Sequence, residues 1–253
     1  MAYPQTRFAS TTVTPDSLVG RRRQAVAKNT VLYQLEVLKK TGRYDAFKLH
    51  WHPTYDEPPE VWPIPNHLFW DSDVAKWIEG ACYLLKQQHL LEVDEAVKDL
   101  VEMIRFAQQP DGYLNLHYTV VEPGKRFTSL RDMHELYNAG HMIEAALAHN
   151  DFYGDDLLLG PVVKYADLLC DVFGPSDKQL HGYPGHPEIE LALLRLHDRT
   201  GNSKHADLAR YFLTERGNPQ GCEGRHYYVV EAEKRGDDPH KQPAFYPEPT
   251  SLW

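Results

Sequence analysis

The sequence predicts an all-α protein, an α/α toroid assembled from pairs of inner and outer helices. The first observation is a short signature that recurs in three apolar helices: Ile78-Glu79-Gly80-Ala81, Ile143-Glu144-Ala145-Ala146 and Ile189-Glu190-Leu191-Ala192. The second is that each apolar helix precedes a more amphipathic one, most clearly over residues 93–104, where apolar residues follow helical spacing. Repeats of this kind indicate stacked helix pairs, which form an open solenoid or close into a toroid.

The other elements follow in chain order. Residues 1–16 are expected to be an extended lead-in, and a helix is expected from Asp16 to Lys40, capped by Asp16 or Ser17. The proline-rich stretch 41–66 predicts a long loop. The second helices of the later pairs are expected over 155–173 and 203–216, each leading into an aromatic loop. We therefore predict one partial α/α-barrel domain over residues 1–253.

Composition and charge exclude several classes of protein. The chain of 253 residues has a formal net charge of −9 and no basic stripe beyond Arg21-Arg22-Arg23, so a nucleic-acid partner is not expected. It has no apolar run of roughly 18 residues, so no membrane partner is expected, and its N-terminus lacks a signal-peptide core. The three cysteines form no CxxC pair and suit a reducing compartment. We expect a soluble, cytoplasmic protein.

Polar residues gather where the inner helices begin. If these helices run in the same direction, their N-terminal ends meet on one face of the toroid. The aromatic loops that follow the outer helices reach that same face. Eight residues are therefore predicted to line one substrate cleft: Asp71, Asp73, Tyr113, His134, Glu135, Tyr183, His186 and Glu188.

The chemistry of this set favours a carbohydrate ligand. Aromatic faces pack against sugar rings, and paired carboxyl groups are the usual machinery of glycosidases. HELYN is not a zinc-binding HExxH motif because position 138 is Asn, and the sequence contains no GxSxG or Walker loop. We assign no catalytic residue and no metal ligand.

Several of these polar residues also have a purely structural interpretation. Ser72 or the neighbouring aspartates can cap a helix, and acids in a first turn suit the helix dipole. His141 fits a core histidine better than a site residue. The glutamates deeper in the inner helices are expected to pair with neighbouring helices or loops, since a buried charge needs a partner: Glu79, Glu144 and Glu190.

Several motifs also resemble a known family. They are FWDSDVAKWIEGACYLL, AQQPDGYLNLHYT, RFTSLRDMHELYNAGHMIEAALAHN, HGYPGHPEIELALLRLHDRTG and HYYVVEAEKRG. Together they resemble the N-terminal half of the β-L-arabinofuranosidases of glycoside hydrolase family 127, over roughly residues 17–250. The resemblance implies an (α/α)6 barrel followed by β-sandwich domains. It also implies a retaining hydrolase that removes terminal β-L-arabinofuranosyl units, with His134 and His186 contacting the sugar.

The resemblance also implies zinc in the full-length family, where a zinc-bound cysteine is the nucleophile and a glutamate is the acid/base. Those family segments match nothing in residues 1–253, and Cys82, Cys170 and Cys222 match none of the zinc ligands. We therefore expect no cofactor in this chain, no independent zinc binding and little hydrolysis, which leaves open whether the chain acts as an enzyme.

Three interpretations remain for the chain as it stands. In the first, the chain is a fragment of a longer enzyme. In the second, it pairs with another copy of itself or with a separate C-terminal half. In the third, it is a degenerate relative that binds sugar without catalysing a reaction. The alternative to a part of an enzyme is a catalytically inactive carbohydrate-binding or interaction module, with self-association left open.

Overall fold

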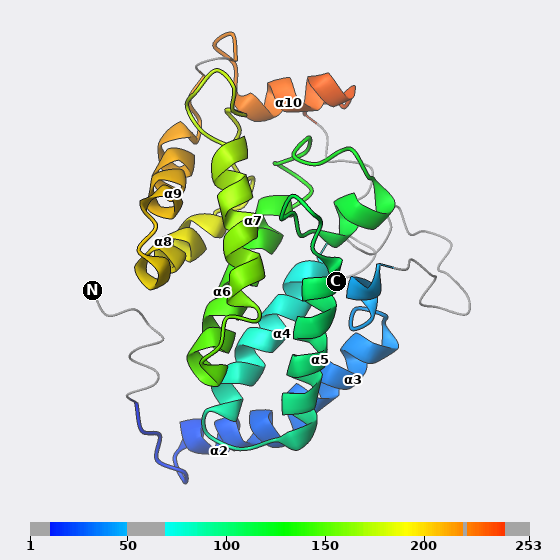
Figure 1. Ribbon diagram of the computed structural model, residues 1–253, viewed down its shortest axis with the longest axis vertical. Helices are drawn as coiled ribbons and strands as arrows, with labels where there is room; N and C mark the ends of the chain where they lie inside the picture. The colour runs from blue at the N-terminus through cyan, green and yellow to red at the C-terminus, as the bar shows by residue number, and fades with distance from the viewer. Residues whose placement is uncertain (1–10, 50–68, 220–221, 241–253) are drawn as a thin grey trace.

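The computed structural model describes residues 11–49, 69–219 and 222–240 and confirms the predicted all-α class (Figure 1). Within these residues the only β-type pairing is an isolated bridge between Phe173 and Leu180. Most of the predicted lead-in (1–10) and most of the proline-rich loop (50–66) lie outside the described residues.

The first helical segment matches the predicted helix over 16–40. It consists of α2 (Leu18–Ala25), a π-helical turn (Val26–Thr30) and α3 (Val31–Lys40). Ser17 caps it, because its hydroxyl accepts a hydrogen bond from the Gly20 N–H at 3.0 Å. A short 3₁₀ turn, Ala46–Lys48, then packs against α5.

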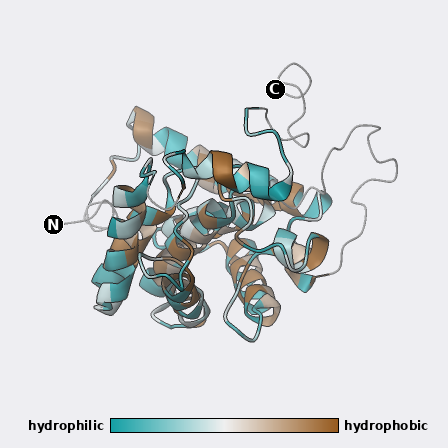
Figure 2. Cartoon of the chain, turned by 90° about the horizontal axis from the view of Figure 1, so that it is seen from above, coloured by the Kyte–Doolittle hydropathy of each residue, from teal (hydrophilic) through white to brown (hydrophobic). Residues whose placement is uncertain are grey.

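Three inner helices form the centre of the molecule. They are α4 (Trp70–Leu85), α6 (Glu135–Tyr153) and α8 (Ile189–Thr200), and α6 packs against both of the others. An outer helix follows each of them: α5 (Leu91–Ala107), α7 (Leu159–Val172) and α9 (Ser203–Glu215). This alternation is the inner and outer pairing that the repeated signature predicts. Seen from above, the hydrophobic sides of the helices face their neighbours (Figure 2).

The inner helices pack closely because small residues lie where they meet. Ala75 and Ala145 are fully buried, and a Cβ added at Gly140 would lie 3.0 Å from the Ile189 Cα at the start of α8. Deeper in, Glu144 of α6 forms an ion pair with Arg195 of α8. Glu144 is thus paired with a neighbouring helix, the structural role expected for it.

Loops close the N-terminal ends of the inner helices. The Leu116 N–H donates to the Asp71 carboxylate at the start of α4, and the Gly185 N–H donates to the Leu130 carbonyl at 2.9 Å. The two loops that precede α6 and α8 are thus joined to each other as well as to the helices.

One expected aromatic loop is instead a helix. Tyr227 and Tyr228 open α10 (Tyr227–Arg235), which lies at the opposite end of the molecule from α2 (Figure 1). The His226 side chain caps this helix by accepting from the Tyr228 N–H. The Tyr227 ring is buried, with its centroid 5.5 Å from that of Tyr183, so burial of the aromatic pair stabilises the first turn.

The close approach of α6 and α8 at Gly140 gives a testable prediction. Gly140→Leu should lower the free energy of unfolding by about 1–3 kcal/mol, because the added side chain meets the backbone of Ile189. Gly160→Leu is the control, since a Cβ at Gly160 meets nothing within 4 Å. Urea unfolding followed by circular dichroism measures both; equal stability of the two variants would contradict the packing described.

Candidate functional site

The structure divides the eight predicted site residues into an accessible group and a buried group. His134, His186 and Glu188 retain exposed surface at the beginnings of α6 and α8. Four others are buried with at most 2% of their surface exposed: Asp71, Tyr113, Glu135 and Tyr183. Asp73 is also partly exposed, and it pairs with Arg43 at 2.8 Å.

The accessible group brings two histidines together from separate segments. The ring centroids of His134 and His186 lie 6.1 Å apart. His134 has a left-handed backbone conformation (φ 54°), and its Nδ1 lies 2.6 Å from the Asp132 carbonyl oxygen. Because a carbonyl only accepts, Nδ1 carries the hydrogen of the neutral ring and Nε2 is its acceptor nitrogen.

Three further residues that were not among the eight predicted ones also belong to this cluster. Tyr137 contacts both histidines, with its ring centroid 4.9 Å from that of His186 and 5.7 Å from that of His134. Lys76 donates to the Tyr137 hydroxyl at 2.7 Å. His141 lies 4.5 Å from Tyr137, ring to ring.

Part of this cluster was visible in the sequence. Residues 134, 137 and 141 follow i, i+3 and i+4 steps, which place side chains on one face of a helix. His141 is half-buried, and its Nδ1 lies 3.5 Å from a Glu188 carboxylate oxygen, so it borders the cluster although a core position was expected. Lys76 had no such signal, because its place depends on how α4 packs against α6.

Burial favours the neutral form of two of these histidines, His134 and His141. Burial, with help from the charge of Lys76, lowers the pKa of His141 to about 4. Burial also lowers the pKa of His134. A neutral imidazole both donates and accepts hydrogen bonds, as the hydroxyl groups of a sugar do. The cluster therefore offers an aromatic, hydrogen-bonding surface beside the Lys76 ammonium group.

The buried group holds the loop that leads to His134. Glu135 accepts hydrogen bonds from the Tyr113 hydroxyl and from the Phe127 N–H, the latter at 2.8 Å. The guanidinium carbon of Arg126 lies 3.7 Å from the centroid of the Tyr113 ring. These contacts give Glu135 and Tyr113 no exposed surface, so they lie beneath the site and not in it.

Tyr183 has a similar supporting position. Its ring lies 5.0 Å from that of Tyr228 and 5.9 Å from that of His226, and the Arg216 guanidinium lies over it. It thereby anchors the loop that carries His186 to α10.

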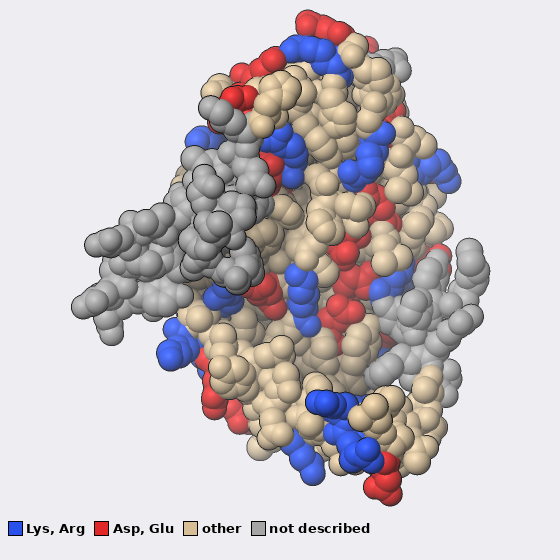
Figure 3. Space-filling view, turned by 180° about the vertical axis from the view of Figure 1, so that it is seen from behind, with Lys and Arg blue, Asp and Glu red and all other residues tan. Residues whose placement is uncertain are grey.

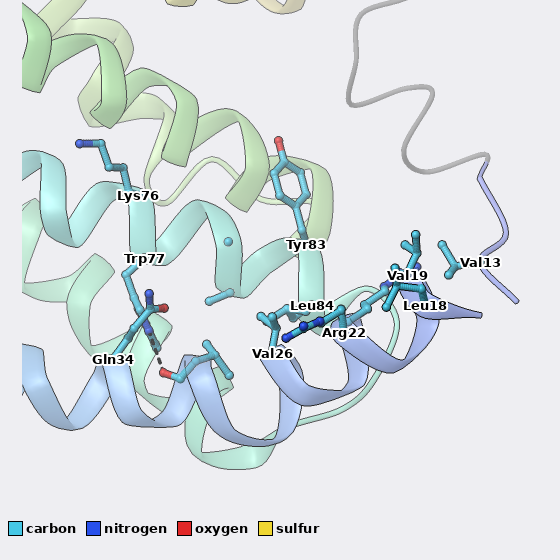
Figure 4. Close-up of a pocket in the computed structure, with 14 residues that line it drawn as sticks. Val13, Leu18, Val19, Arg22, Val26, Gln34, Lys76, Trp77, Tyr83 and Leu84 are labelled. Carbon is cyan, nitrogen blue, oxygen red and sulfur yellow. Dashed lines mark hydrogen bonds between the residues drawn. The ribbon is translucent and has the colours of Figure 1, made fainter. Parts of the chain in front are cut away.

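A groove that shares Lys76 with the cluster around Tyr137 lies between α2 and α4 (Figure 4). It has a volume of about 650 Å³ and a mostly apolar lining that includes Trp77 and Leu84, together with the basic residues Arg22 and Lys76. Figure 3 shows acidic and basic side chains interspersed across the middle of the rear face, so charge there is locally balanced. None of the described helices is long and apolar enough to cross a membrane.

Comparison with known proteins identifies the family. Residues 12–242 match the family model described as β-L-arabinofuranosidase, GH127 catalytic domain. The chain belongs to glycoside hydrolase family 127. A non-reducing end β-L-arabinofuranosidase of Bifidobacterium longum subsp. longum is 40% identical over 158 residues, which cover 60% of this chain and 24% of that protein.

Two solved GH127 structures resemble the chain. A β-L-arabinofuranosidase from Geobacillus stearothermophilus T6 has a TM-score of 0.79 and 38% identity, covering 92% of this chain and 36% of that one. A second GH127 β-arabinofuranosidase has a TM-score of 0.73 and 35% identity, covering 83% and 33%. The α/α toroid class is thus confirmed, and the chain spans about a third of the length of these relatives or less.

The zinc site that the GH127 resemblance implies does not fit the residues described. Among them, no group of three or more His, Cys, Asp or Glu side chains could hold a metal ion. Burial raises the pKa of both the Cys82 and the Cys170 thiols to about 12. A nucleophilic cysteine needs a lowered pKa, so neither thiol suits that role.

The buried carboxyl groups predict how stability depends on pH. Burial raises the pKa of Glu135 to about 8 and that of Asp71 to about 7. Between these values and their unfolded pKa values near 4, the folded state binds more protons than the unfolded state. The free energy of unfolding should therefore fall as pH rises from about 5 to about 8, by at most about 1.4 kcal/mol per pH unit for each group.

Glu135→Gln should flatten this pH dependence, because glutamine does not titrate. Urea unfolding at several pH values measures the effect. Glu95→Gln, an exposed position on α5, is the control and should retain the wild-type slope. A wild-type slope in Glu135→Gln would contradict a neutral buried carboxyl group.

Proposed function

We propose that this chain is the sugar-binding part of a glycoside hydrolase catalytic domain that acts on terminal β-L-arabinofuranosides. The observation that carries the proposal is the convergence of His134 and His186, from two separate inner-helix entrances, onto one accessible aromatic cluster. The β-L-arabinofuranosidase activity of its GH127 relatives supports the choice of sugar.

The cluster has the chemistry that a furanoside requires. His134 and His186 are proposed to hydrogen-bond sugar hydroxyls, and Glu188 accepts from a further hydroxyl. Phe69, whose ring lies 4.9 Å from that of His134, supplies an apolar surface for ring carbons. A small sugar can thereby be held by polar groups on one side and aromatic edges on the other.

The buried acids have a supporting role in this proposal. Asp71 and Glu135 hold the loop before α6, and Tyr113 and Tyr183 anchor the loops that carry the two histidines. Asp73 contributes through its ion pair with Arg43. We propose that these residues shape the site without touching the sugar.

We assign no nucleophile and no general acid to residues 1–253. The thiols of Cys82 and Cys170 are protonated at neutral pH, and the carboxyl group of Glu135 is sealed from solvent. In this proposal the chain binds and orients the sugar, and zinc chemistry belongs to other parts of full-length GH127 proteins.

The histidines provide the direct test. His134→Ala and His186→Ala should each weaken binding of methyl β-L-arabinofuranoside about tenfold, the loss expected for about 1.4 kcal/mol of hydrogen bonding. His89→Ala, an exposed position in the turn after α4, should bind like the wild type. Titration calorimetry with the full chain measures all three. Wild-type affinity in both site variants would contradict the assignment.

A second candidate function is a catalytically inactive interaction module that pairs with a second copy or with a separate C-terminal half. The observation that favours it is the groove beside α2, where Leu18 and Val19 are more than 60% exposed. Exposed apolar surface of this kind marks interaction sites. Sedimentation velocity over a range of concentrations tests self-association. A monomer at every concentration would contradict the homodimer.

A further inference from the structure

Lys76 has an unusual set of contacts for a surface lysine. Its ammonium group donates to the Tyr137 hydroxyl at 2.7 Å and lies 4.7 Å from the centroid of the same ring. No carboxylate lies within ion-pair distance of it in the part of the chain that the structure describes. Lys98, by contrast, has a carboxylate partner, Asp94, at 2.7 Å. Lys76 is therefore directed at the tyrosine.

Tyr137 is the centre of the aromatic cluster. Its ring makes edge contacts with four others: Phe69, His134, His141 and His186. These rings come from three segments, the entrance of α4, the first turns of α6 and the entrance of α8. A rotation of the Tyr137 ring would therefore displace both histidines assigned to the sugar.

We propose that Tyr137 is a specificity-determining contact for the sugar and that Lys76 is the positioning residue that fixes its hydroxyl group. The inference rests on the proposed function, because it concerns the same site. The Tyr137 oxygen already accepts from Lys76, so its own hydrogen remains available for donation to a sugar oxygen. The ammonium group has two further hydrogens, which can reach a second oxygen of the same ligand.

This arrangement favours a neutral sugar that presents two neighbouring oxygen atoms. Once a bound sugar covers these donors, a donor without its partner is costly, so a site of this kind discriminates against analogues that lack a hydroxyl group. A deoxy analogue of the sugar should therefore bind more weakly than the parent compound.

The charge of Lys76 has a second effect on the imidazoles. The charged groups that face His134 are Lys76 from α4 and Asp132 from its own segment, with the imidazole of His186 beside it. Those that face His141 are Lys76 and Glu188, again beside His186. Lys76 disfavours protonation of both rings, which keeps them able to accept hydrogen bonds.

The first experiment needs no sugar. In the full chain, Lys76→Met should raise the imidazole pKa values of His134 and His141, measured by ¹⁵N-detected NMR titration. Lys98→Met is a matched control, because Lys98 also lies over a tyrosine ring, 5.8 Å from the centroid of Tyr153, but far along the chain from the cluster. Unchanged imidazole pKa values in Lys76→Met would overturn the role of Lys76.

The second experiment measures binding of methyl β-L-arabinofuranoside by calorimetry. Tyr137→Phe should weaken it about tenfold while the ring packing is kept, and Lys76→Arg, which retains a donor, should bind more tightly than Lys76→Met. Tyr33→Phe, at an exposed position on α3, is the control. Wild-type affinity in Tyr137→Phe would overturn the inference about Tyr137 but leave the proposed function intact. If the unaltered chain binds no furanoside, the proposed function fails, and the NMR titration still decides the role of Lys76.

Discussion

The hydrogen bonds of the Glu135 carboxyl group organise this end of the molecule. Glu135 occupies the first turn of α6, the helix that packs against both other inner helices. Its side chain binds the Tyr113 hydroxyl and the Phe127 N–H, and so fastens the long preceding loop to the helix entrance. The residue immediately before it, His134, is thereby held in a left-handed conformation that is uncommon for residues other than glycine.

The left-handed backbone of His134 depends on the contacts of the buried Glu135 carboxyl group. A left-handed backbone at a non-glycine residue costs free energy, and it persists only where surrounding contacts determine it. The contacts that do so here are the Glu135 hydrogen bonds and the short Nδ1 contact of His134 with Asp132. The buried Glu135 side chain thus supports the site from beneath, without exposed surface in it.

Three neighbouring inner helices and the segments that precede them contribute side chains to the aromatic cluster. α6 supplies His134, Tyr137 and His141, the segment before α8 supplies His186, and α4 supplies Lys76. Small residues such as Gly140 let the helices approach closely enough for these side chains to meet. The packing that builds the core therefore also builds the site.

The sequence by itself determined the helix pairing, the family and the two histidines at the inner-helix entrances. It could do so because helical periodicity, caps and repeated signatures are local patterns. It also placed Asp71, Glu135, Tyr113 and Tyr183 at the correct ends of their elements.

Whether a side chain at such an end faces solvent or the interior depends on the loop that covers it. Only the tertiary structure decided that these four are buried, because hydrogen bonds between distant segments closed the loops over them. The place of Lys76 beside Tyr137 likewise follows from the packing of α4 on α6, which no local pattern encodes.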